Sequence, residues 1–245
     1  MRRPPHLRAD RVLATLEKLE ARIVARFPDA GLTKVCADLL DVARLSASDA
    51  AHLARPSFLW RGITLAMIVL GVAAQIAAFR FLRIEAGSLT APELLQGLEA
   101  AVNLLILFGG GVWFVLTLEE RAKRRRVLDA LHRLRSLAHV IDMHQLTKDP
   151  TVVLDAHKTP ASPERTMTQF ELTRYLDYCA EMLALIGKLA ALYAEGMRDN
   201  VVINAVNDIE NLTNGLGRKI WQKITIIGAL EEARAPSPQV AISTS

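Results

Sequence analysis

The sequence has few of the residues on which disulfide-rich folds and thiolate metal sites depend. Two cysteines among 245 residues are too few for a disulfide framework or a four-thiolate zinc site. Aromatic residues make up only 5% of the chain. The 13 glycines and 10 prolines are ordinary numbers for a chain of this length, and they exclude collagen-like repeats. The chain also lacks the Walker, Rossmann, nucleophile-elbow and zinc-protease motifs. None of its patterns resembles a family with a known activity.

Hydrophobic residues, in contrast, are abundant and unevenly distributed. They make up 51% of the chain, and the mean hydropathy is +0.21 although 23% of the residues are charged. The segments from Gly62 to Phe79 and from Ala100 to Leu118 contain no charged residue. As helices they would measure roughly 27 and 28 Å, close to a hydrocarbon core of about 30 Å. They predict two membrane spans, at about 60–80 and 99–118; the alternative is a pair of buried core helices in a soluble domain.

The distribution of basic residues predicts the orientation of these spans. Lys and Arg are frequent before the first span and after the second, whereas the segment between them holds Arg80 and Arg83 and then only acidic charges. We therefore expect a multi-pass protein of the cytoplasmic (inner) membrane with both termini in the cytoplasm. No apolar segment precedes the first span, so this span is expected to act as the insertion signal. Cys36 and Cys179 would then be free thiols in a reducing compartment.

A strongly basic segment follows the second span directly. The net charge of +4 and the pI near 9.3 are compatible with nucleic-acid binding, but much of the basic excess lies beside the membrane. We expect these side chains to contact anionic lipid headgroups, or only to set the topology, and we expect no nucleic-acid partner. The residues are Arg121, Lys123, Arg124, Arg125 and Arg126.

The rest of the chain has the periodicity of helices, so the predicted fold class is all-α. A two-span transmembrane hairpin (58–118) would join a cytoplasmic bundle made by an N-terminal helical hairpin (1–57) and a C-terminal helical domain (119–233), followed by a mobile tail (234–245). Helices are expected at about 10–27 and 32–45, with a linker from Ser46, and a loop at 147–165. The second span is expected to continue as one helix to Gln145. Gly109–Gly111 within it indicates close helix packing, or alternatively a hinge.

The last expected helix, which follows a break at 197–200 and extends to about Ala233, has an unusual stripe of asparagines. They recur at spacings of four and three, so they lie within about 40° of one direction on a helix. Solvated helix faces are normally rich in Glu and Lys, whereas Asn is a poor helix former. The stripe is therefore a candidate polar interface with another copy, the 147–165 loop or a polar ligand, and the alternative is plain solvent exposure. Its members are Asn200, Asn204, Asn207, Asn211 and Asn214.

Side chains able to support catalysis are sparse. His132, His139 and His144 share the long helix with Asp142. His139 and Asp142 are one helical turn apart and could be two metal ligands, but His144 points elsewhere and no second acid or Cys lies at a matching spacing. We expect no enzymatic activity, no cofactor and no metal; a metal-dependent activity through this group is the remaining alternative.

Two functions fit these features. The first is a self-associating, membrane-anchored helical scaffold or sensor that presents its cytoplasmic bundle to a protein partner. The second is an oligomeric pore or ion channel lined by the second span, with Glu99 and Asn103 at its outer mouth. The two share contacts with membrane lipid and with further copies of the chain.

Overall fold

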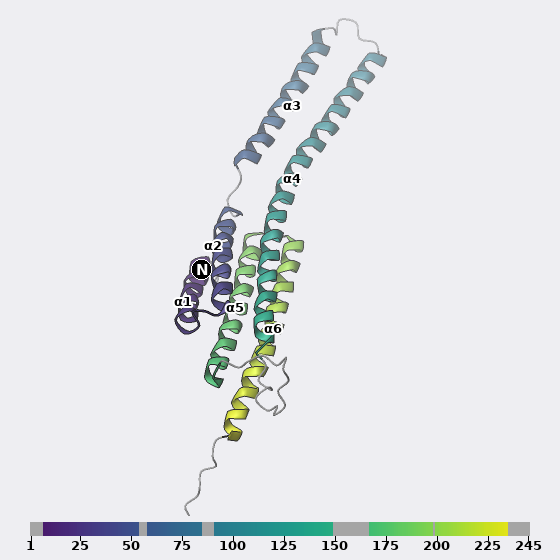
Figure 1. The fold of residues 1–245 in the computed structure, drawn as a ribbon. Coiled ribbons are helices and arrows are strands. Elements are labelled where there is room, and N and C mark those ends of the chain that lie inside the picture. Colours follow the sequence, from purple (N-terminus) through teal and green to yellow (C-terminus); the bar gives the residue numbers. More distant parts are fainter. Residues whose placement is uncertain (1–6, 54–57, 85–90, 149–166, 198, 235–245) are drawn as a thin grey trace, which may run out of the picture. The chain divides into compact units, whose positions relative to one another are not determined.

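The computed structural model describes residues 7–53, 58–84, 91–148, 167–197 and 199–234. These residues form six helices and no strand, which confirms the all-α fold class (Figure 1). The helices are α1 (Ala9–Arg26), α2 (Gly31–Leu53), α3 (Phe58–Ile84), α4 (Ala91–Leu146), α5 (Gln169–Gly196) and α6 (Asn200–Arg234). The chain divides into two compact units, Met1–His52 with Leu128–Ser245, and Leu53–Val127. The expected loop at 147–165 and the tail fall almost entirely outside the described residues.

The first unit begins with the hairpin of α1 and α2. Spacings of four and three residues place the apolar side chains of α1 on one face, and all of them are buried. Pro28 follows the helix, and the hydroxyl of Thr33 donates a 2.6 Å hydrogen bond to the Phe27 carbonyl, which holds the turn into α2. The Phe27 ring packs edge-on against Tyr175 and Tyr178 of α5. This contact fixes the hairpin on the surface of α5.

The predicted end of the second helix near residue 45 is wrong. α2 continues to Leu53 without interruption through the segment that we expected to be a linker. Ser46 is 2% exposed, and the Ser48 hydroxyl donates a 2.8 Å hydrogen bond back to the Leu45 carbonyl within the helix. Serine tolerates a helix when its hydroxyl bonds to the preceding turn, and the next proline comes only at Pro56. The two serines therefore do not break the helix.

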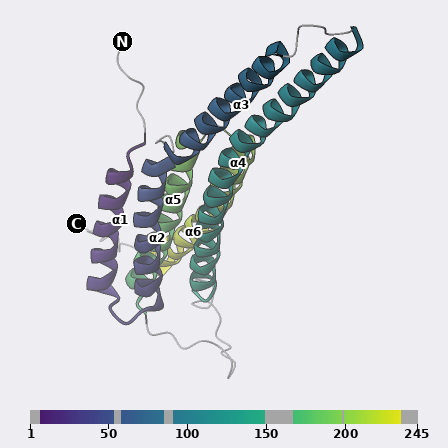
Figure 2. The ribbon, with the colours of Figure 1, turned by 90° about the horizontal axis from the view of Figure 1, so that it is seen from above.

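Helix α5 is the central helix of this unit. It begins with a capping box, in which the Thr168 hydroxyl accepts from the Glu171 backbone N–H and the Glu171 carboxylate accepts from the Thr168 backbone N–H. Along its length the apolar face is buried, and so are neighbouring positions, because α1 and α6 pack against it. The buried heptad positions are Leu172, Tyr175, Cys179, Met182, Ile186, Leu189 and Tyr193. Figure 2 shows α5 passing behind α2 within this unit.

A close approach joins α5 to α6. A methyl group added at Gly187 would lie 3.2 Å from the Thr213 hydroxyl, so this glycine lets the two backbones come together. Thr213 is 4% exposed, and its hydroxyl donates to the Glu210 carbonyl of its own helix. The C-terminal part of α4 completes the bundle through Leu131, Leu134, Ala138 and Ile141, all of which are buried.

The second unit contains α3 and the N-terminal part of α4, which run side by side as a hairpin (Figure 1). The ring of Phe108 lies where a Cβ atom at Gly71 would be, and a Cβ at Gly111 would lie 3.3 Å from the Met67 methyl group. Glycine thus allows close packing at two levels of this hairpin. Gly109 and Gly110 have nothing within 4 Å of an added Cβ, so only the third glycine of the run takes part in the packing.

One helix of the described residues is long and apolar enough to cross a membrane, and it lies within Leu95–Leu146 of α4. The described apolar stretch of α3, Gly62–Ala77, is shorter, at about 24 Å for a rise of 1.5 Å per residue. The predicted second span therefore has a matching helix. The two-span hairpin as a whole is not confirmed.

Candidate functional site

The asparagine stripe of α6 lies on the surface of the bundle. All five side chains are exposed, while the opposite side of the same helix is buried through Val202, Ile209, Ile220 and Ile227. No hydrogen bond joins any of the five amides to another side chain in the described part of the chain. The stripe continues toward the C-terminus through exposed Arg218 and ends beside Trp221, which is 60% exposed. The result is a long polar face with one basic and one large aromatic residue, which we call the Asn face.

The basic segment after the apolar part of α4 does not present all of its charges freely. Lys123 forms an ion pair with Glu119, with 2.7 Å between Nζ and Oε1, and both side chains are partly buried. Arg124 is half-buried and also has an interaction partner. Arg121, Arg125 and Arg126 are exposed, so these three guanidinium groups are the ones available to an external anion.

Glu99 and Asn103 are both exposed and lie on one face of α4, one helical turn apart. At about 100° per residue they point between 140° and 180° away from Phe108, which packs on α3. The structure therefore places both polar side chains on the side of α4 that α3 does not cover.

The histidines of α4 do not come together. His132 and His139 are exposed, whereas His144 is half-buried against Gly31, where an added Cβ would lie 2.6 Å from the imidazole Cε1. Within the described ranges no three His, Cys, Asp or Glu side chains form a group that could hold a metal ion. Asp142 instead accepts a 2.6 Å hydrogen bond from the Gln145 amide.

That hydrogen bond belongs to a polar cluster at the end of α4 that sequence analysis did not identify. Gln145 is 1% exposed, and Lys223 of α6 donates to its backbone carbonyl at 2.9 Å and to its side-chain oxygen at 2.7 Å. The lysine thereby satisfies a carbonyl of the last turn of α4 and places a positive charge at the negative end of the helix dipole. No sequence pattern signals the pair, because its members are 78 residues apart.

Tyr175 and Cys179 lie close to this cluster on α5. The Tyr175 hydroxyl is 3.5 Å from His144 Nδ1, and the Lys148 ammonium lies 5.3 Å from the tyrosine ring centre. Burial raises the pKa of the Cys179 thiol to about 12, although Lys223 and Lys148 act in the opposite direction. Since the thiolate is the reactive form of cysteine, a thiol with this pKa is not prepared for nucleophilic attack. The arrangement fits a structural cluster that joins α4, α5 and α6.

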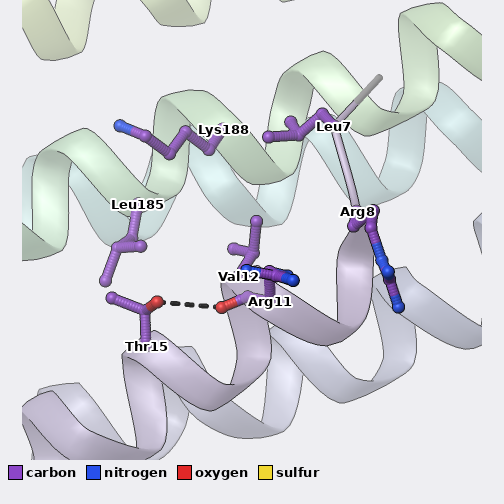
Figure 3. A pocket seen from close by; sticks show the side chains of 7 residues that line it. All are labelled: Leu7, Arg8, Arg11, Val12, Thr15, Leu185 and Lys188. Carbon is purple, nitrogen blue, oxygen red and sulfur yellow. Dashed lines mark hydrogen bonds between the residues drawn. The ribbon is translucent and has the colours of Figure 1, made fainter. Parts of the chain in front are cut away.

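An open groove of about 390 Å³ lies between the start of α1 and α5 (Figure 3). Its floor is apolar and three basic side chains surround it; the lining residues are Leu7, Arg8, Arg11, Val12, Thr15, Leu185 and Lys188. Figure 3 shows Arg8 and Lys188 at opposite ends of the groove, and Arg8 forms an ion pair with Asp10. The basic groups do not converge on one point, so the groove lacks the geometry of an anion site.

No family model, no curated protein and no solved structure matches this chain. Three features described above are exposed and could contact other molecules. They are the apolar hairpin of α3 and α4, the three exposed arginines that follow it, and the Asn face.

Proposed function

We propose that this chain is an integral membrane protein of the inner membrane, anchored by the α3–α4 hairpin with both termini in the cytoplasm. In this proposal the bundle works without enzymatic activity as a scaffold or sensor that self-associates and presents helical surface to a cytoplasmic protein. Arg121, Arg125 and Arg126 would contact anionic lipid headgroups where α4 leaves the membrane.

The observation that carries the anchoring proposal is the contrast between the two ends of α4. In its first part, Leu105 and Leu107 are 67% and 76% exposed, and Trp113 is 72% exposed. In its last part, Leu134 and Ile141 are completely buried in the bundle. Soluble monomers rarely expose a contiguous apolar surface of more than a few hundred Å². A helix that buries a continuous apolar stripe at one end and exposes most of its large apolar side chains at the other is suited to two different solvents.

The packing of α3 on α4 supports the proposal that α3, like α4, is a membrane helix. Its large apolar side chains away from α4 are exposed, among them Leu65, Val69 and Leu70. An apolar helix packed on one side by another apolar helix and open on the other sides is the expected form of a membrane hairpin. The helix extends over 27 residues from Phe58 to Ile84, and no charged residue lies between Arg61 and Arg80.

A substitution on the exposed apolar surface tests this proposal directly. We expect the double variant Leu105→Arg, Leu107→Arg to leave the membrane fraction, because an arginine near the centre of a bilayer costs about 2.5–3.5 kcal/mol by insertion scales. The measurement is the fraction of protein that stays in membranes after an alkaline carbonate wash. Val24→Arg, at a 44% exposed apolar residue of α1, is the matched control and should stay in the membrane. Wild-type protein that is soluble without detergent would overturn the proposal.

The Asn face supports the scaffold or sensor role. Interfaces are depleted in Lys and Glu and enriched in Trp and Arg relative to the rest of a protein surface, and the Asn face has this composition. An amide also both donates and accepts hydrogen bonds, so a line of asparagines is complementary to itself as well as to polar groups of another protein. We therefore assign self-association or partner binding of the bundle to α6.

The oligomeric pore remains a second candidate because Glu99 and Asn103 are exposed on the side of α4 away from α3. Several copies arranged with this side inward would place a ring of carboxylates at the outer mouth of a path. The test is ion flux into liposomes that contain the purified protein. A pore predicts flux, with a cation preference that Glu99→Gln reduces, whereas a scaffold predicts none.

A further inference from the structure

The side of α4 that α3 leaves open is not uniformly apolar. At about 100° per residue, five exposed residues lie between 140° and 180° from Phe108 and between 80° and 160° from Gly111, the two residues that face α3. Their spacings of four, three, four and three residues match the repeat of helices that pack along a continuous seam. We call this set the open face of α4; it consists of Glu99, Asn103, Ile106, Gly110 and Trp113.

Asn103 is the residue that lipid alone would not satisfy. It is exposed, and in the described part of the chain its amide has no hydrogen-bond partner. It lies inside the uncharged run from Ala100 to Leu118, at a depth of roughly 5 Å from the start of that run. An amide without a partner in hydrocarbon is costly, since no water is present to replace the missing hydrogen bonds. The open face therefore calls for a partner that carries hydrogen-bonding groups at the same depth.

We propose that the partner is the open face of α4 in a second copy of this chain. The inference rests on the proposed membrane anchoring, because insertion gives every copy the same orientation and places Asn103 of each copy at the same depth. An amide donates and accepts at once, so the two Asn103 side chains can bond to each other. Helix α3 of the same chain does not take this place, because it packs against Phe108 and Gly111 and leaves the open face exposed.

Gly110 supports close contact at the centre of the seam. Nothing lies within 4 Å of a Cβ built at this residue, although Gly111, the next residue, faces Met67 of α3. Small residues on an open helix face let the backbones of membrane helices approach closely, and interhelical Asn hydrogen bonds add to that packing. Glu99 lies just before the uncharged run, where the membrane surface is hydrated, so its charge can remain in water at the outer end of the seam.

Disulfide crosslinking in native membranes tests the contact. Ile106 and Leu105 are each 67% exposed and adjacent in sequence, but only Ile106 lies on the open face. After mild oxidation we expect Ile106→Cys to give a crosslinked species of twice the mass of the chain, and Leu105→Cys to give none. Wild-type protein is the control for Cys36 and Cys179, which are both buried. Adding Asn103→Leu to the Ile106→Cys variant should lower the crosslinked fraction roughly threefold, as expected for the loss of one interhelical hydrogen bond.

The outcomes separate this inference from the proposed function. Protein that stays in carbonate-washed membranes but crosslinks equally at both positions, or at neither, overturns the contact and leaves the anchoring intact. A crosslinked product whose mass differs from that of a dimer shows a different partner and also overturns it. Protein absent from the membrane fraction overturns the anchoring, and the contact with it.

Discussion

Cys36 and Cys179 are both completely buried in the helical bundle, one on α2 and one on α5. Burial disfavours the charged thiolate and raises the pKa of each thiol to about 12. For Cys36 a smaller contribution in the same direction comes from the charge of Glu20. Both side chains therefore behave as small apolar core residues whose chemistry is suppressed by the fold.

We expect neither thiol to react with a maleimide at pH 8 while the protein is folded, and both to react rapidly in denaturant. The folded pKa lies above the usual value near 9, so the bundle prefers the protonated thiols. Their contribution to stability is then complete below about pH 9 and is lost as the pH rises toward 12. Mass spectrometry of labelled protein and denaturation at several alkaline pH values check this. Rapid labelling without denaturant would contradict it.

Lys223 and Gln145 illustrate a second effect of single residues, the satisfaction of buried polar groups. The lysine serves two oxygens of a residue that is 1% exposed. Removing one partner from such a pair leaves the other desolvated and unpaired, which costs about 1–3 kcal/mol in proteins. The pair therefore ties the end of α4 to α6 more firmly than a surface contact between the same residue types would.

Among the helices, the hairpin of α3 and α4 depends on the absence of a side chain at Gly71. We expect Gly71→Ala to destabilise the protein in detergent by about 1–3 kcal/mol, since the new methyl group overlaps the Phe108 ring and forces the hairpin apart. Gly62→Ala is the matched control, because nothing lies within 4 Å of a Cβ at that residue. Thermal denaturation of both variants measures the difference. Adding Phe108→Ala to Gly71→Ala should recover part of the loss.

The role of α6 is tested by an equally local change. Asn207→Leu places an apolar side chain in the middle of the Asn face, and we expect it to change the oligomeric size of the detergent-solubilised protein. Lys219→Leu is the control, because Lys219 is also exposed but lies about 100° away from the stripe. Light scattering after size-exclusion chromatography measures the mass of each variant. An unchanged mass for Asn207→Leu would remove the Asn face as a surface for self-association.

Most helices of the bundle were predictable because apolar side chains at spacings of three and four mark a buried face. The predicted start of α1 and the long continuation of α4 agree with the structure to within a few residues. The end of α2 was not predictable in the same way. Ser46 is polar in the sequence, and only the packing around it shows that it lies in the core.

The protein as a whole presents two units with opposite treatment of their apolar residues. One unit buries most of its large apolar residues between helices, and the other exposes most of them, among them Leu70, Leu98 and Leu107. Such a division is expected when one part of a chain folds in water and the other is surrounded by lipid. It also explains why a chain with 23% charged residues can have a positive mean hydropathy.

The proposed topology gives a test of the complete chain. Reporters fused separately to the N-terminus and the C-terminus should both report a cytoplasmic location, because the basic residues lie before α3 and after the apolar part of α4. A reporter inserted at Gly87, between the two helices, should report the opposite side. Termini on opposite sides would mean that only one helix crosses the membrane, which would refute the hairpin and keep the anchor.

The helices and their buried faces follow from local spacing, because a rotation of about 100° per residue makes neighbours of residues three and four apart. The apolar runs likewise follow from composition alone. Contacts between distant segments do not, since nothing local indicates that Phe108 packs on Gly71 or that Lys223 reaches Gln145. The side of α4 left open by α3 is a property of that packing. The sequence shows that Glu99 and Asn103 share a face, but only the contact with α3 shows that this face is free.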